Sequence, residues 1–588
     1  MQLNGSQIFV EVLCEQGVDT IFGYPGGAVL NLYDELYKNS DRIHHVLTAH
    51  EQGASHAADG YARATGRTGV VLATSGPGAT NLVTGIATAY MDSVPMVAFT
   101  GNVATTGLGK DGFQEAYIEG ITMPITKHNF TVRRVEELAD TMRSAFRIAQ
   151  SGRKGPVLVD IPKDVTAAVC EFTPKQPEQI RTVTTYDEQQ VKWAADIINA
   201  AKRPLVYFGG GVRSAASCQP LRDLIHKAEI PATYTLMAAG VVPYGDPMNI
   251  GMVGMHGCYT SNRAVADCDV LIALGTRFSD RVALNPKTFA KNATIIQIDI
   301  DPSELGKNVD VDLAIAGDVC YVLSGMLPLI EEKKHPDWMK MIHEWQAQDY
   351  HPVSDPNRLM PHQVIGEVCS QCGPEAVYVT DVGQHQMWAH QFLPREFPRT
   401  FLSSGGLGTM GFGFPAAIGA AVVIMPDLVP YAADRLRSWQ DPFADPLGDG
   451  HQTIQSLYAI GSGGATGLGL GNSRQKYLYV PEPQNDFIFS IVCEELGFIG
   501  AMAVIILFAL FVVRGFIIAS RAPDKFGSML AVGLTAQIGI QAIVNIAVVT
   551  NTIPNTGISL PFFSYGGTAL AVQLAEVGIV LSVSRQMR

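Results

Sequence analysis

Two long apolar stretches near the end of the chain restrict its folding more than any other feature. They read GFIGAMAVIILFALFVVRGFIIAS at residues 497–520 and FGSMLAVGLTAQIGIQAIVNIAVV at residues 526–549. A helix of about twenty apolar residues crosses the hydrocarbon core of a membrane. A third run fits within residues 561–583, and three in series with polar turns are not typical of a soluble core. The sequence therefore predicts an all-α transmembrane segment of about three helices within residues 430–588.

The preceding part of the chain has a different pattern. Short apolar runs alternate with amphipathic helical patterns up to about residue 330, as in GVVLATSGPGATNL, RPLVYFGGGV and ATIIQIDIDP. This alternation is typical of parallel α/β layers. Polar stretches with proline near residues 170–190 and 331–360 are candidate linkers. The sequence therefore predicts three α/β domains, at residues 1–168, 190–330 and 360–423.

Composition and charge limit the partners and the compartment. The 588 residues carry a net charge of -13 without a cluster of Lys and Arg, which argues against a nucleic-acid partner. The nine cysteines are scattered, and Cys369 and Cys372 form a lone C-x-x-C, so a reducing compartment is expected. Residues 1–20 lack a basic region followed by an apolar core. We therefore expect residues 1–423 to be cytoplasmic and the following region to lie in the cell membrane.

Three places in the sequence combine turn-forming residues with groups that could bind a ligand or take part in a reaction. Glu51 follows a short apolar stretch and precedes a small-residue helix, so its carboxyl is expected at a strand end facing a cleft. An E-Q-G triplet is also a common helix start. The turn Gly76-Pro77-Gly78 follows a β-rich run and would let backbone amides approach a ligand, as would the glycines of FGGGV at residues 208–212. An ordinary α/β turn has the same pattern.

Four motifs together carry a family resemblance. They are FGYPGGAVLNLYDEL from Phe22, AHEQGASHAADGYARATGRTGV from Ala49, ATSGPGATNL from Ala73 and GKDGFQEAYIEGITMPITKHNF from Gly109. Over about residues 1–422 the chain resembles the acetohydroxyacid (acetolactate) synthase large subunit. The resemblance implies a thiamine-diphosphate enzyme of branched-chain amino-acid biosynthesis, which decarboxylates pyruvate and transfers the two-carbon unit to pyruvate or 2-ketobutyrate. It also implies FAD, Mg²⁺, a homodimer and a small regulatory subunit.

The same resemblance implies roles for individual residues. Glu51 would hydrogen-bond a pyrimidine nitrogen of thiamine and so assist removal of the thiazolium proton. Phe113, Gln114 and Lys127 would line the substrate pocket. Arg281 would select the second ketoacid through its carboxylate, a bidentate task suited to guanidinium. The family usually has an aspartate where this chain has Ser279, which changes the setting of Arg281.

Further residues are implied to hold the two organic cofactors. Those expected at thiamine diphosphate are Gly26, Gly76, Pro77, Gly78, Gln384, His385 and Met410. Those expected at a structural flavin are Gly209, Gly210, Gly211, Gly254, Met255, His256, Gly275, Thr276, Arg277, Asp299 and Asp318.

The triplet Gly448-Asp449-Gly450 invites interpretation as the metal site. In the family a Gly-Asp-Gly follows a buried strand, and an Asn about twenty-five to thirty residues later completes the Mg²⁺ ligands. Here Pro442 and Pro446 interrupt the preceding segment, so it does not fit a central strand. Asn472 and Asn485 lie 22 and 35 residues past Gly450, outside that spacing. We therefore predict that the Mg²⁺ ligands are absent and that the third α/β domain is incomplete.

The region after the triplet resembles a second family. The stretches GLGLGNSRQKYLYVPEPQNDFIFSIVCEELGFIG and NTIPNTGISLPFFSYGGTAL are similar to the C-terminal part of the SEDS proteins (FtsW, RodA and SpoVE), which polymerise peptidoglycan strands. The resemblance covers about residues 430–585 and implies Asp486 as the catalytic carboxylate, although a helix cap is an alternative for it. Nearby polar groups would be Arg474, Lys476, Glu494 and Glu495. The earlier membrane helices of that family are absent.

The two resemblances imply conflicting topologies. Arg521 and Lys525 follow the first span and Arg585 and Arg588 follow the last, so these groups are expected in the cytoplasm and residues 430–485 outside. No span separates that loop from the synthase-like part. Three hypotheses follow: a synthase that lacks its metal site, a membrane glycan polymerase that needs helices from another chain, or an accidental fusion near residues 423–430 without activity.

Overall fold

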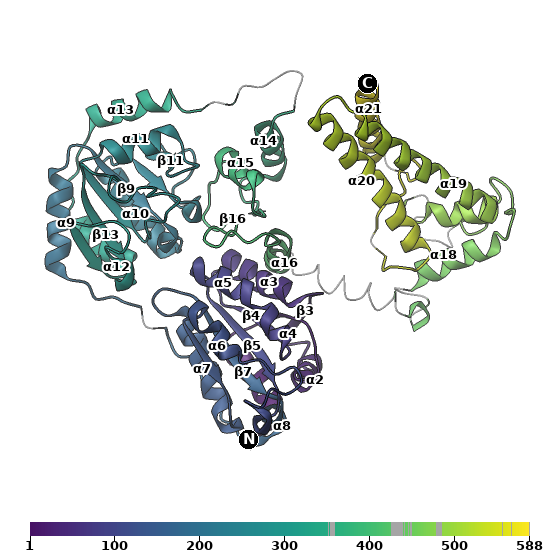
Figure 1. Cartoon of the computed structure of the whole chain (residues 1–588), viewed down its shortest axis with the longest axis horizontal. Helices are drawn as coiled ribbons and strands as arrows, with labels where there is room; N and C mark the ends of the chain where they lie inside the picture. Colours follow the sequence, from purple (N-terminus) through teal and green to yellow (C-terminus); the bar gives the residue numbers. More distant parts are fainter. Residues whose placement is uncertain are drawn as a thin grey trace. The chain divides into compact units, whose positions relative to one another are not determined.

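The computed structural model describes most of the chain and divides it into two compact units. The units are Met1–Pro426 and Asp427–Arg588, and each is described here by itself (Figure 1). The described residues are 1–180, 182–350, 352, 359–424, 439, 441–444, 446, 450–477, 485–555, 557–565 and 567–586.

The first domain is built on a six-stranded parallel sheet in the order β3-β2-β4-β5-β7-β6. Its strands are β2 (Thr20–Gly23), β3 (His44–Leu47), β4 (Gly69–Ala73), β5 (Met96–Asn102), β6 (His128–Thr131) and β7 (Pro156–Pro162). In the centre, Gly69 of β4 lies opposite Met96 of β5, and the strands are buried on both faces. Apolar runs of five to seven residues form such strands because helices cover both sides of the sheet.

The helices of this domain follow the predicted alternation with the strands. They are α1 (Gly5–Glu15), α2 (Leu30–Lys38), α3 (Glu51–Thr65), α4 (Pro77–Asn81), α5 (Val83–Met91), α6 (Ile118–Thr122), α7 (Val135–Gln150) and α8 (Lys163–Ala167). Phe9 of α1 packs edge-on against Phe99 of β5, with ring centroids 4.9 Å apart. The short strands β1 (Gln2–Asn4) and β8 (Val169–Glu171) pair antiparallel and join the two ends of the domain.

The middle domain contains a second six-stranded parallel sheet, in the order β11-β10-β9-β12-β13-β14. Its strands are β9 (Pro204–Phe208), β10 (Ala232–Tyr234), β11 (Asn249–Met252), β12 (Val270–Leu274), β13 (Thr294–Asp299) and β14 (Leu313–Ala316). Counted from the first strand the order is 3-2-1-4-5-6, the arrangement of doubly wound sheets that bind dinucleotides. The chain reverses direction across the sheet between β9 and β12, which are hydrogen-bonded neighbours.

Four longer helices cover the middle sheet. They are α9 (Glu188–Ala200), α10 (Ala215–Lys227), α11 (Tyr259–Asp267) and α12 (Val319–Met326). A further helix, α13 (Pro336–Gln346), carries the fully buried Trp338, whose indole N–H donates to the carbonyl of Pro204 at 2.9 Å. The polar stretch near residues 331–360, expected as a linker, therefore begins with a helix that belongs to the middle domain.

The third segment of this unit has little sheet of its own. Its described elements are α14 (Pro361–Cys372), β15 (Tyr378–Val379), α15 (Gln384–Phe392), β16 (Phe401–Leu402) and α16 (Gly413–Ile424), and its two strands pair in parallel. The parallel sheets confirm the predicted α/β fold class.

Helix α16 crosses α3 of the first domain at very close range. A Cβ atom on Gly60 of α3 would lie 2.2 Å from the carbonyl oxygen of Ala416. In the opposite direction, a Cβ on Gly419 of α16 would lie 1.9 Å from the carbonyl oxygen of Ala57. The two glycines therefore permit the backbones of the helices to touch, and this contact packs the third segment against the first domain.

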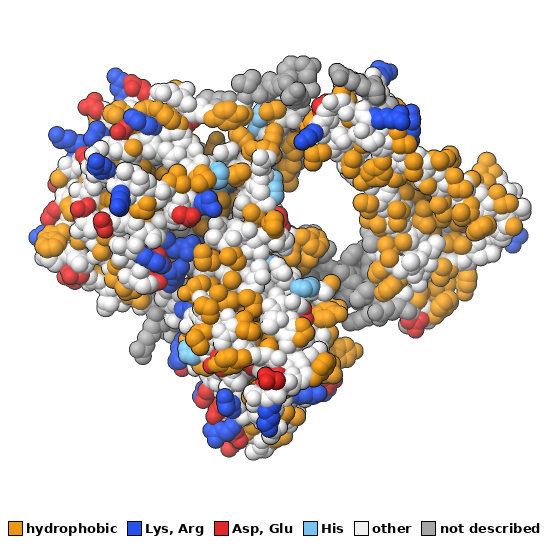
Figure 2. Space-filling model, in the orientation of Figure 1, with side chains coloured by type: hydrophobic (Ala, Val, Ile, Leu, Met, Phe, Trp, Pro, Cys, Tyr) orange, Lys and Arg blue, Asp and Glu red, His pale blue; other side chains and the backbone are white. Residues whose placement is uncertain are grey.

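The C-terminal unit is helical. Its described α-helices are α18 (His451–Ser462), α19 (Ile488–Ser520), α20 (Lys525–Val549) and α21 (Gly567–Ser584). By length and composition, α19 and α20 are the two helices able to cross a membrane in the described part of the chain. Figure 2 shows hydrophobic side chains over most of the visible face of this unit. These helices confirm the first two predicted spans.

The third predicted span differs from the structure, because α21 begins only at Gly567. Phe562 has φ +65°, and the hydroxyl of Ser564 accepts a hydrogen bond from the amide of Leu560 at 2.7 Å. Residues 561–565 therefore form a turn, and the helix occupies the later part of the run that the sequence predicts within residues 561–583. The apolar helix that remains is shorter than α19 and α20, so the expectation of about three spanning helices becomes two.

A break in α19 marks where its apolar span begins. Gly497 has φ +66° and ψ -170°, which no right-handed helix contains. The carbonyl of Glu494, left without its helical partner, accepts from the amide of Leu468 at 3.0 Å, and the amide of Phe498 donates to Gly464 at 2.9 Å. The neighbouring loop thus satisfies the groups that the break leaves open, and the uninterrupted helix after Gly497 is the predicted first span.

The α3–α16 crossing is tested by substituting Gly419 with alanine. We expect Gly419→Ala to destabilise the N-terminal unit by about 1–3 kcal/mol, because the new methyl group meets backbone that must shift. The measurement is the midpoint of thermal unfolding of the full chain in detergent. Gly366→Ala in α14 is the matched control, since a Cβ there meets nothing within 4 Å and alanine favours a helix. An equal midpoint for the two variants would contradict the packing described.

Candidate functional site

The carboxyl ends of β2, β3 and β4 converge on Glu51. Glu51 is the first residue of α3, and 8% of it is exposed. The amide group of Asn81 donates to its Oε2 at 3.0 Å. A Cβ on Gly78 would lie 3.0 Å from Glu51 Oε1, and a Cβ on Gly26 would lie 2.5 Å from Thr74. The structure thus brings Glu51, Gly26 and the Gly-Pro-Gly turn together, as expected for a parallel sheet.

Gln114 lies on the other side of the same turn. Gly76 has φ +59°, and a Cβ there would lie 2.8 Å from the carbonyl oxygen of Gln114, which itself has φ +57°. The carboxylate of Glu115 accepts from the amides of Lys110 at 3.2 Å and Gly112 at 2.9 Å, and these amides hold its pKa below the ordinary value. The side chains of Phe113 and Gln114 are exposed at the edge of the site.

Lys127 is not part of this group. Its ammonium donates to the carbonyl of Ser151 at 2.6 Å and to that of Ile148, at the end of α7. It lines a second, smaller cavity of about 420 Å³, together with Asp301. Burial lowers the pKa of Lys127 to about 8, and the charge of Asp301 opposes the shift. Lys127 therefore contacts the end of α7 and lines the second cavity.

A cavity of about 1380 Å³ opens at the carboxyl edge of the middle sheet. The predicted site residues that line it are Gly209, Gly210, Gly211, Met255, His256, Gly275, Thr276, Arg277, Arg281, Asp299, Asp318 and Gln384. They follow β9, β11, β12, β13 and β14 or begin the next helix, which is where a doubly wound sheet binds its ligand. Gly254, with φ +112°, supports the wall, because a Cβ there would lie 2.6 Å from the carbonyl of Arg281.

Two glycine turns meet at the reversal point of this sheet. A Cβ on Gly211 would lie 2.8 Å from Cα of Gly275, and a Cβ on Gly209 would lie 2.5 Å from the carbonyl oxygen of Gly275. Asp299, at the end of β13, is buried, and burial raises its pKa to about 6. The turns leave the backbone accessible to a ligand at the point where topology favours a dinucleotide.

The side chain of Arg281, a predicted catalytic group on this wall, is 69% exposed. Its Nε lies 3.9 Å from a carboxylate oxygen of Asp280, and its Nη1 lies 4.0 Å from the sulfur of Met255. Ser279 accepts backbone hydrogen bonds from Val282 and Ala283 through its carbonyl, so it shapes the turn that carries Arg281. The guanidinium is thus held loosely and is available to a carboxylate ligand.

The third segment contributes Gln384, His385 and Met410. Gln384 and His385 begin α15, and Met410 is 78% exposed on the loop before α16. The carboxylate of Asp381 fixes that loop by accepting from the amides of Gly411 and Gly413, both at 3.0 Å. Burial raises the pKa of Asp381, but these amides outweigh burial and lower it overall.

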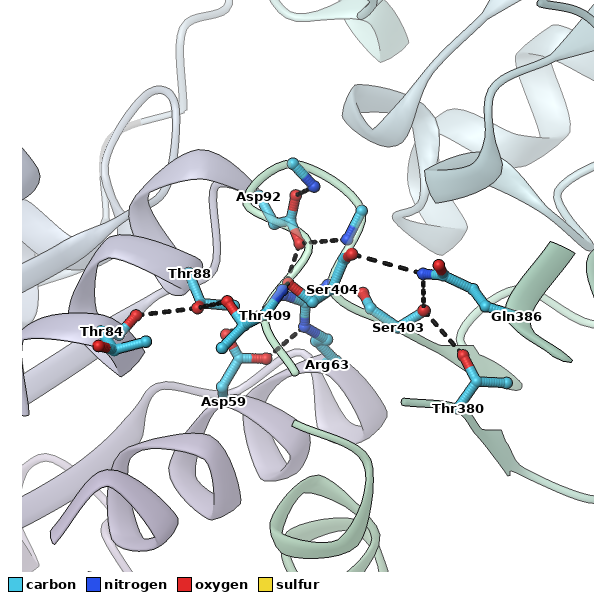
Figure 3. Close-up of polar contacts among 12 residues, drawn as sticks. Asp59, Arg63, Thr84, Thr88, Asp92, Thr380, Gln386, Ser403, Ser404 and Thr409 are labelled. Atoms are coloured by element: carbon cyan, nitrogen blue, oxygen red, sulfur yellow. Dashed lines mark hydrogen bonds and ion pairs between the residues drawn. The ribbon is translucent and has the colours of Figure 1, made fainter. Parts of the chain in front are cut away.

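A buried ion-pair network joins this segment to the first domain (Figure 3). Arg63 of α3 lies between Asp59 and Asp92, with Nη2 2.8 Å from an Asp92 oxygen. Its Nη1 donates to the carbonyl of Ser403 at 2.9 Å. Asp92 in turn accepts from the amides of Gly405 at 3.1 Å and Gly406 at 2.7 Å. Burial alone lowers the pKa of Arg63, but the two carboxylates raise it overall, so it stays charged.

Comparison with known proteins decides the family. Residues 3–121 match the family described as thiamine pyrophosphate enzyme, N-terminal TPP binding domain, and residues 191–326 match the thiamine pyrophosphate enzyme central domain. The acetolactate synthase of Mycobacterium bovis is 49% identical over 435 residues, covering 72% of this chain and 70% of that protein. The chain belongs to the acetolactate synthase family.

Relatives from distant organisms agree with this assignment. The acetolactate synthase isozyme 1 large subunit of Escherichia coli is 46% identical over 425 residues, covering 72% of this chain and 75% of that protein. The probable acetolactate synthase large subunit of Methanocaldococcus jannaschii is 47% identical over 439 residues, covering 71% and 73%. The predicted resemblance over residues 1–422 is confirmed.

The C-terminal residues match a different family. Residues 401–588 match the FtsW/RodA/SpoVE family, described as cell cycle protein. This match confirms the second predicted resemblance, and it begins inside the third segment of the synthase part. The two matches in one chain are consistent with a chimera.

The triplet that was considered as the metal site lies largely outside the described residues. Of its members only Gly450 is described, in the turn before α18. The amide of Asn472 donates to the carbonyl of Leu468 at 3.2 Å. Cys369 and Cys372 are free thiols in α14. Among the residues that the structure describes, no three His, Cys, Asp or Glu side chains are grouped as metal ligands.

Asp486 is positioned by the loop before α21. Asn545 of α20 donates to the carbonyls of Asp486 and Ile558, both at 2.7 Å. A Cβ on Gly557 would lie 3.5 Å from an oxygen of the Asp486 carboxylate. The hydroxyl of Ser564 donates to the carbonyl of Asn485 at 2.6 Å.

The four polar residues expected near Asp486 form a cluster of their own. The carboxylate of Glu494 accepts from the amide of Arg474 at 3.0 Å and from the hydroxyl of Ser473. Glu495 pairs with Lys476 at 2.8 Å. These carboxylates therefore fix the loop before the α19 helix.

Several residues of the synthase site are not predicted by its motifs. Asn81, which orients Glu51, lies in the quoted ATSGPGATNL motif, so its polar side chain four residues after Pro77 was an available signal. Asp59 and Arg63 are charged residues one helical turn apart among alanines, which is typical of a buried pair. Asp92 has no local signal, because Arg63 lies 29 residues earlier and the amides of Gly405 and Gly406 lie more than 300 residues later in the sequence.

The environment of Lys127 predicts a pH dependence. An unfolded lysine keeps its proton up to a pH of about 10.4, whereas folded Lys127 loses it near pH 8. The free energy of unfolding therefore increases as the pH rises from about 8 to about 10.4, because only the unfolded state keeps the proton there, and this group adds no pH dependence below or above that range. Competitive amine labelling followed by mass spectrometry should give a half-maximal reactivity of Lys127 near pH 8. The exposed Lys192 is the control, and identical profiles for the two lysines would refute the assignment.

Proposed function

We propose that residues 1–424 carry the cofactor-facing residues of an acetolactate synthase but turn over pyruvate negligibly. The observation that carries the proposal is the buried Glu51 carboxylate, held by Asn81 beside the Gly-Pro-Gly turn, in a chain of this family. Turnover is expected to fail because the Mg²⁺ ligands of the third domain are missing from the sequence. The diphosphate charge would then have no counter-ion.

Thiamine diphosphate fits the edge of the first sheet. Gly26 and Gly78 leave space that a side chain would fill, and the carboxylate of Glu51 faces that space. The cofactor, when bound, supplies the carbon that attacks the ketoacid carbonyl. Glu51 would hold a proton at the pyrimidine nitrogen, and Asn81 would keep its carboxylate in place. Gln384, His385 and Met410 would contact the same cofactor.

The ketoacid substrates would meet Phe113, Gln114 and Arg281. The backbone of Gln114 passes close to Gly76, and its side chain would donate a hydrogen bond to the bound ketoacid. Arg281 would bind the carboxylate of the second ketoacid, pyruvate or 2-ketobutyrate. The position of Lys127 gives it a supporting role for the end of α7 in this arrangement.

A flavin dinucleotide fits the cavity of the middle domain. The glycine turns after β9 and β12 supply accessible backbone at the reversal point of the sheet, and Asp299 and Asp318 stand at the ends of the neighbouring strands. Its role would be structural. No Mg²⁺ site is expected, because the sequence offers no Asp and Asn at the required spacing after a buried strand.

The exposed apolar residues at the Glu51 site favour a second copy of the chain as the partner. Phe113 is 89% exposed and Met410 is 78% exposed, and large apolar side chains at a rim are commonly buried by association. A homodimer with a small regulatory subunit would follow the family pattern. We place this part in the cytoplasm.

A second candidate function is a fragment of a SEDS glycan polymerase. The match over residues 401–588 and the two apolar helices favour it. Asp486 would then deprotonate a sugar hydroxyl of the lipid-linked precursor, in the cell membrane. The membrane helices missing from this chain would have to come from another protein.

A third candidate is an accidental fusion of two genes without activity. One amplicon from the source DNA that spans the codons for Met410 to Trp439 separates it from the other two. An uninterrupted product shows that the fusion gene exists. Products that continue into each family's own missing part would show that the two functions belong to two proteins.

The proposal predicts negligible acetolactate formation from pyruvate. The full chain, purified in detergent and supplied with thiamine diphosphate, Mg²⁺ and FAD, should give no more product than Glu51→Gln, because neither variant holds the cofactor's diphosphate through a metal. The measurement is a colorimetric assay of acetolactate. Product that depends on thiamine diphosphate and disappears in Glu51→Gln would overturn the proposal.

A further inference from the structure

Three basic side chains on the wall of the large cavity have no carboxylate partner among the residues that the structure describes. They are Lys154, Arg213 and Arg399. Arg213 donates to the carbonyl of Gly210 at 3.3 Å, and Arg399 donates to the carbonyl of Arg63 at 3.0 Å. Within the described ranges, no acidic side chain lies within ion-pair distance of any of the three.

Two other arginines on the same wall show the contrast. Arg63 is paired with Asp59 and Asp92, and Arg153 lies 2.7 Å from an oxygen of Glu304. The chain thus supplies carboxylates to these two cations and leaves their neighbours uncompensated. Partly buried positive charge without a counter-ion is unfavourable, so the arrangement is poised to gain free energy from a bound anion.

The three groups are close enough to repel one another. Burial lowers the pKa of Arg213 to about 10, and the charges of Arg63 and Arg399 add to the shift while Asp92 and Asp59 oppose it. The pKa of Lys154 is likewise lowered, first by burial and then by Arg399 and Arg213. A single ligand with several anionic oxygens would relieve this repulsion at all three positions.

The position of Arg213 connects the group to the glycine turns. Arg213 follows the Gly209-Gly210-Gly211 turn, and a Cβ on Gly210 would lie 3.7 Å from its Nε. A ligand that approaches this backbone at the reversal point of the sheet therefore comes within reach of the guanidinium. Guanidinium groups bind phosphoryl oxygens in a bidentate manner, and a lysine ammonium adds a point charge.

We propose that Lys154, Arg213 and Arg399 form a phosphoryl-binding corner of the cavity, which holds the diphosphate of a dinucleotide. The inference rests on the proposed flavin function for the identity of the occupant, but the corner itself requires only phosphoryl oxygens. It assigns the charged part of the ligand to residues that the family motifs do not mark.

The test uses the full chain in detergent and three probes: FAD, riboflavin and inorganic diphosphate. Binding is measured by flavin fluorescence and by calorimetry for Arg213→Gln and Lys154→Gln, with Lys192→Gln as a control that removes the same charge from an exposed helix position. Each corner variant should weaken binding of FAD and diphosphate at least tenfold and leave riboflavin unchanged. Arg213→Lys, which keeps the charge, should recover part of the lost affinity. This recovery would show that the loss in Arg213→Gln is not caused by misfolding.

The outcomes separate this inference from the flavin proposal. If the chain binds diphosphate but not FAD, and the corner variants lose diphosphate, the corner stands and the flavin proposal fails. If FAD binds equally to the parent, Arg213→Gln and Lys154→Gln, the corner is wrong while the flavin proposal survives. Absence of any diphosphate or FAD binding by the parent chain overturns both.

Discussion

The N-terminal unit depends on a buried arginine held between two aspartates. Arg63 pairs with Asp59 and Asp92 while its remaining N–H group reaches the carbonyl of Ser403. Removing either partner of a buried pair leaves an uncompensated charge, which costs about 3–5 kcal/mol. Because Asp92 also accepts from two amides of the third segment, the same network fixes the segment that closes one side of the large cavity. The close α3–α16 crossing reinforces this attachment.

The two parts of the chain require different surroundings. The synthase part buries its apolar strands inside two parallel sheets, so the surface that these domains present to water is less apolar. The helices α19 and α20 keep large apolar side chains exposed, including Leu507, Leu510 and Ile543, which water disfavours and lipid accepts. Charges at Arg521 and Lys525 would place the preceding loop, and with it the synthase part, outside the cell. One polypeptide does not meet both requirements without misplacing one of its parts.

Features encoded locally could be predicted from the sequence. Glu51, Gly78 and the glycines after β9 lie at strand ends, and a parallel sheet brings such ends to one edge whatever the rest of the fold. The spans of α19 and α20 follow from hydropathy alone. The order of the middle sheet is not encoded in any short motif, and its 3-2-1-4-5-6 arrangement became visible only in the structure. The prediction of the cofactors comes from the resemblance to a known family more than from the periodicity of the sequence.

What failed or was missed depends on contacts distant in sequence. Asp92 pairs with Arg63 of another helix and accepts from two amides of the third segment, so no local pattern marks it. The motif that contains Lys127 does not show that backbone carbonyls at the end of α7 accept hydrogen bonds from its ammonium. Hydropathy does not show where α21 begins within residues 561–583, because the left-handed conformation of Phe562 and the Ser564 hydrogen bond form a turn there.

The central claim is that this chain keeps the organic-cofactor surfaces of a synthase and lacks its metal clamp. Calorimetric titration of thiamine diphosphate into the full chain, with and without Mg²⁺, tests it most directly. The account predicts that any binding is weak and unchanged by Mg²⁺, because no ligand pair joins the metal to the diphosphate. Tight binding that appears only with Mg²⁺ would contradict the account and would show that the metal ligands are present.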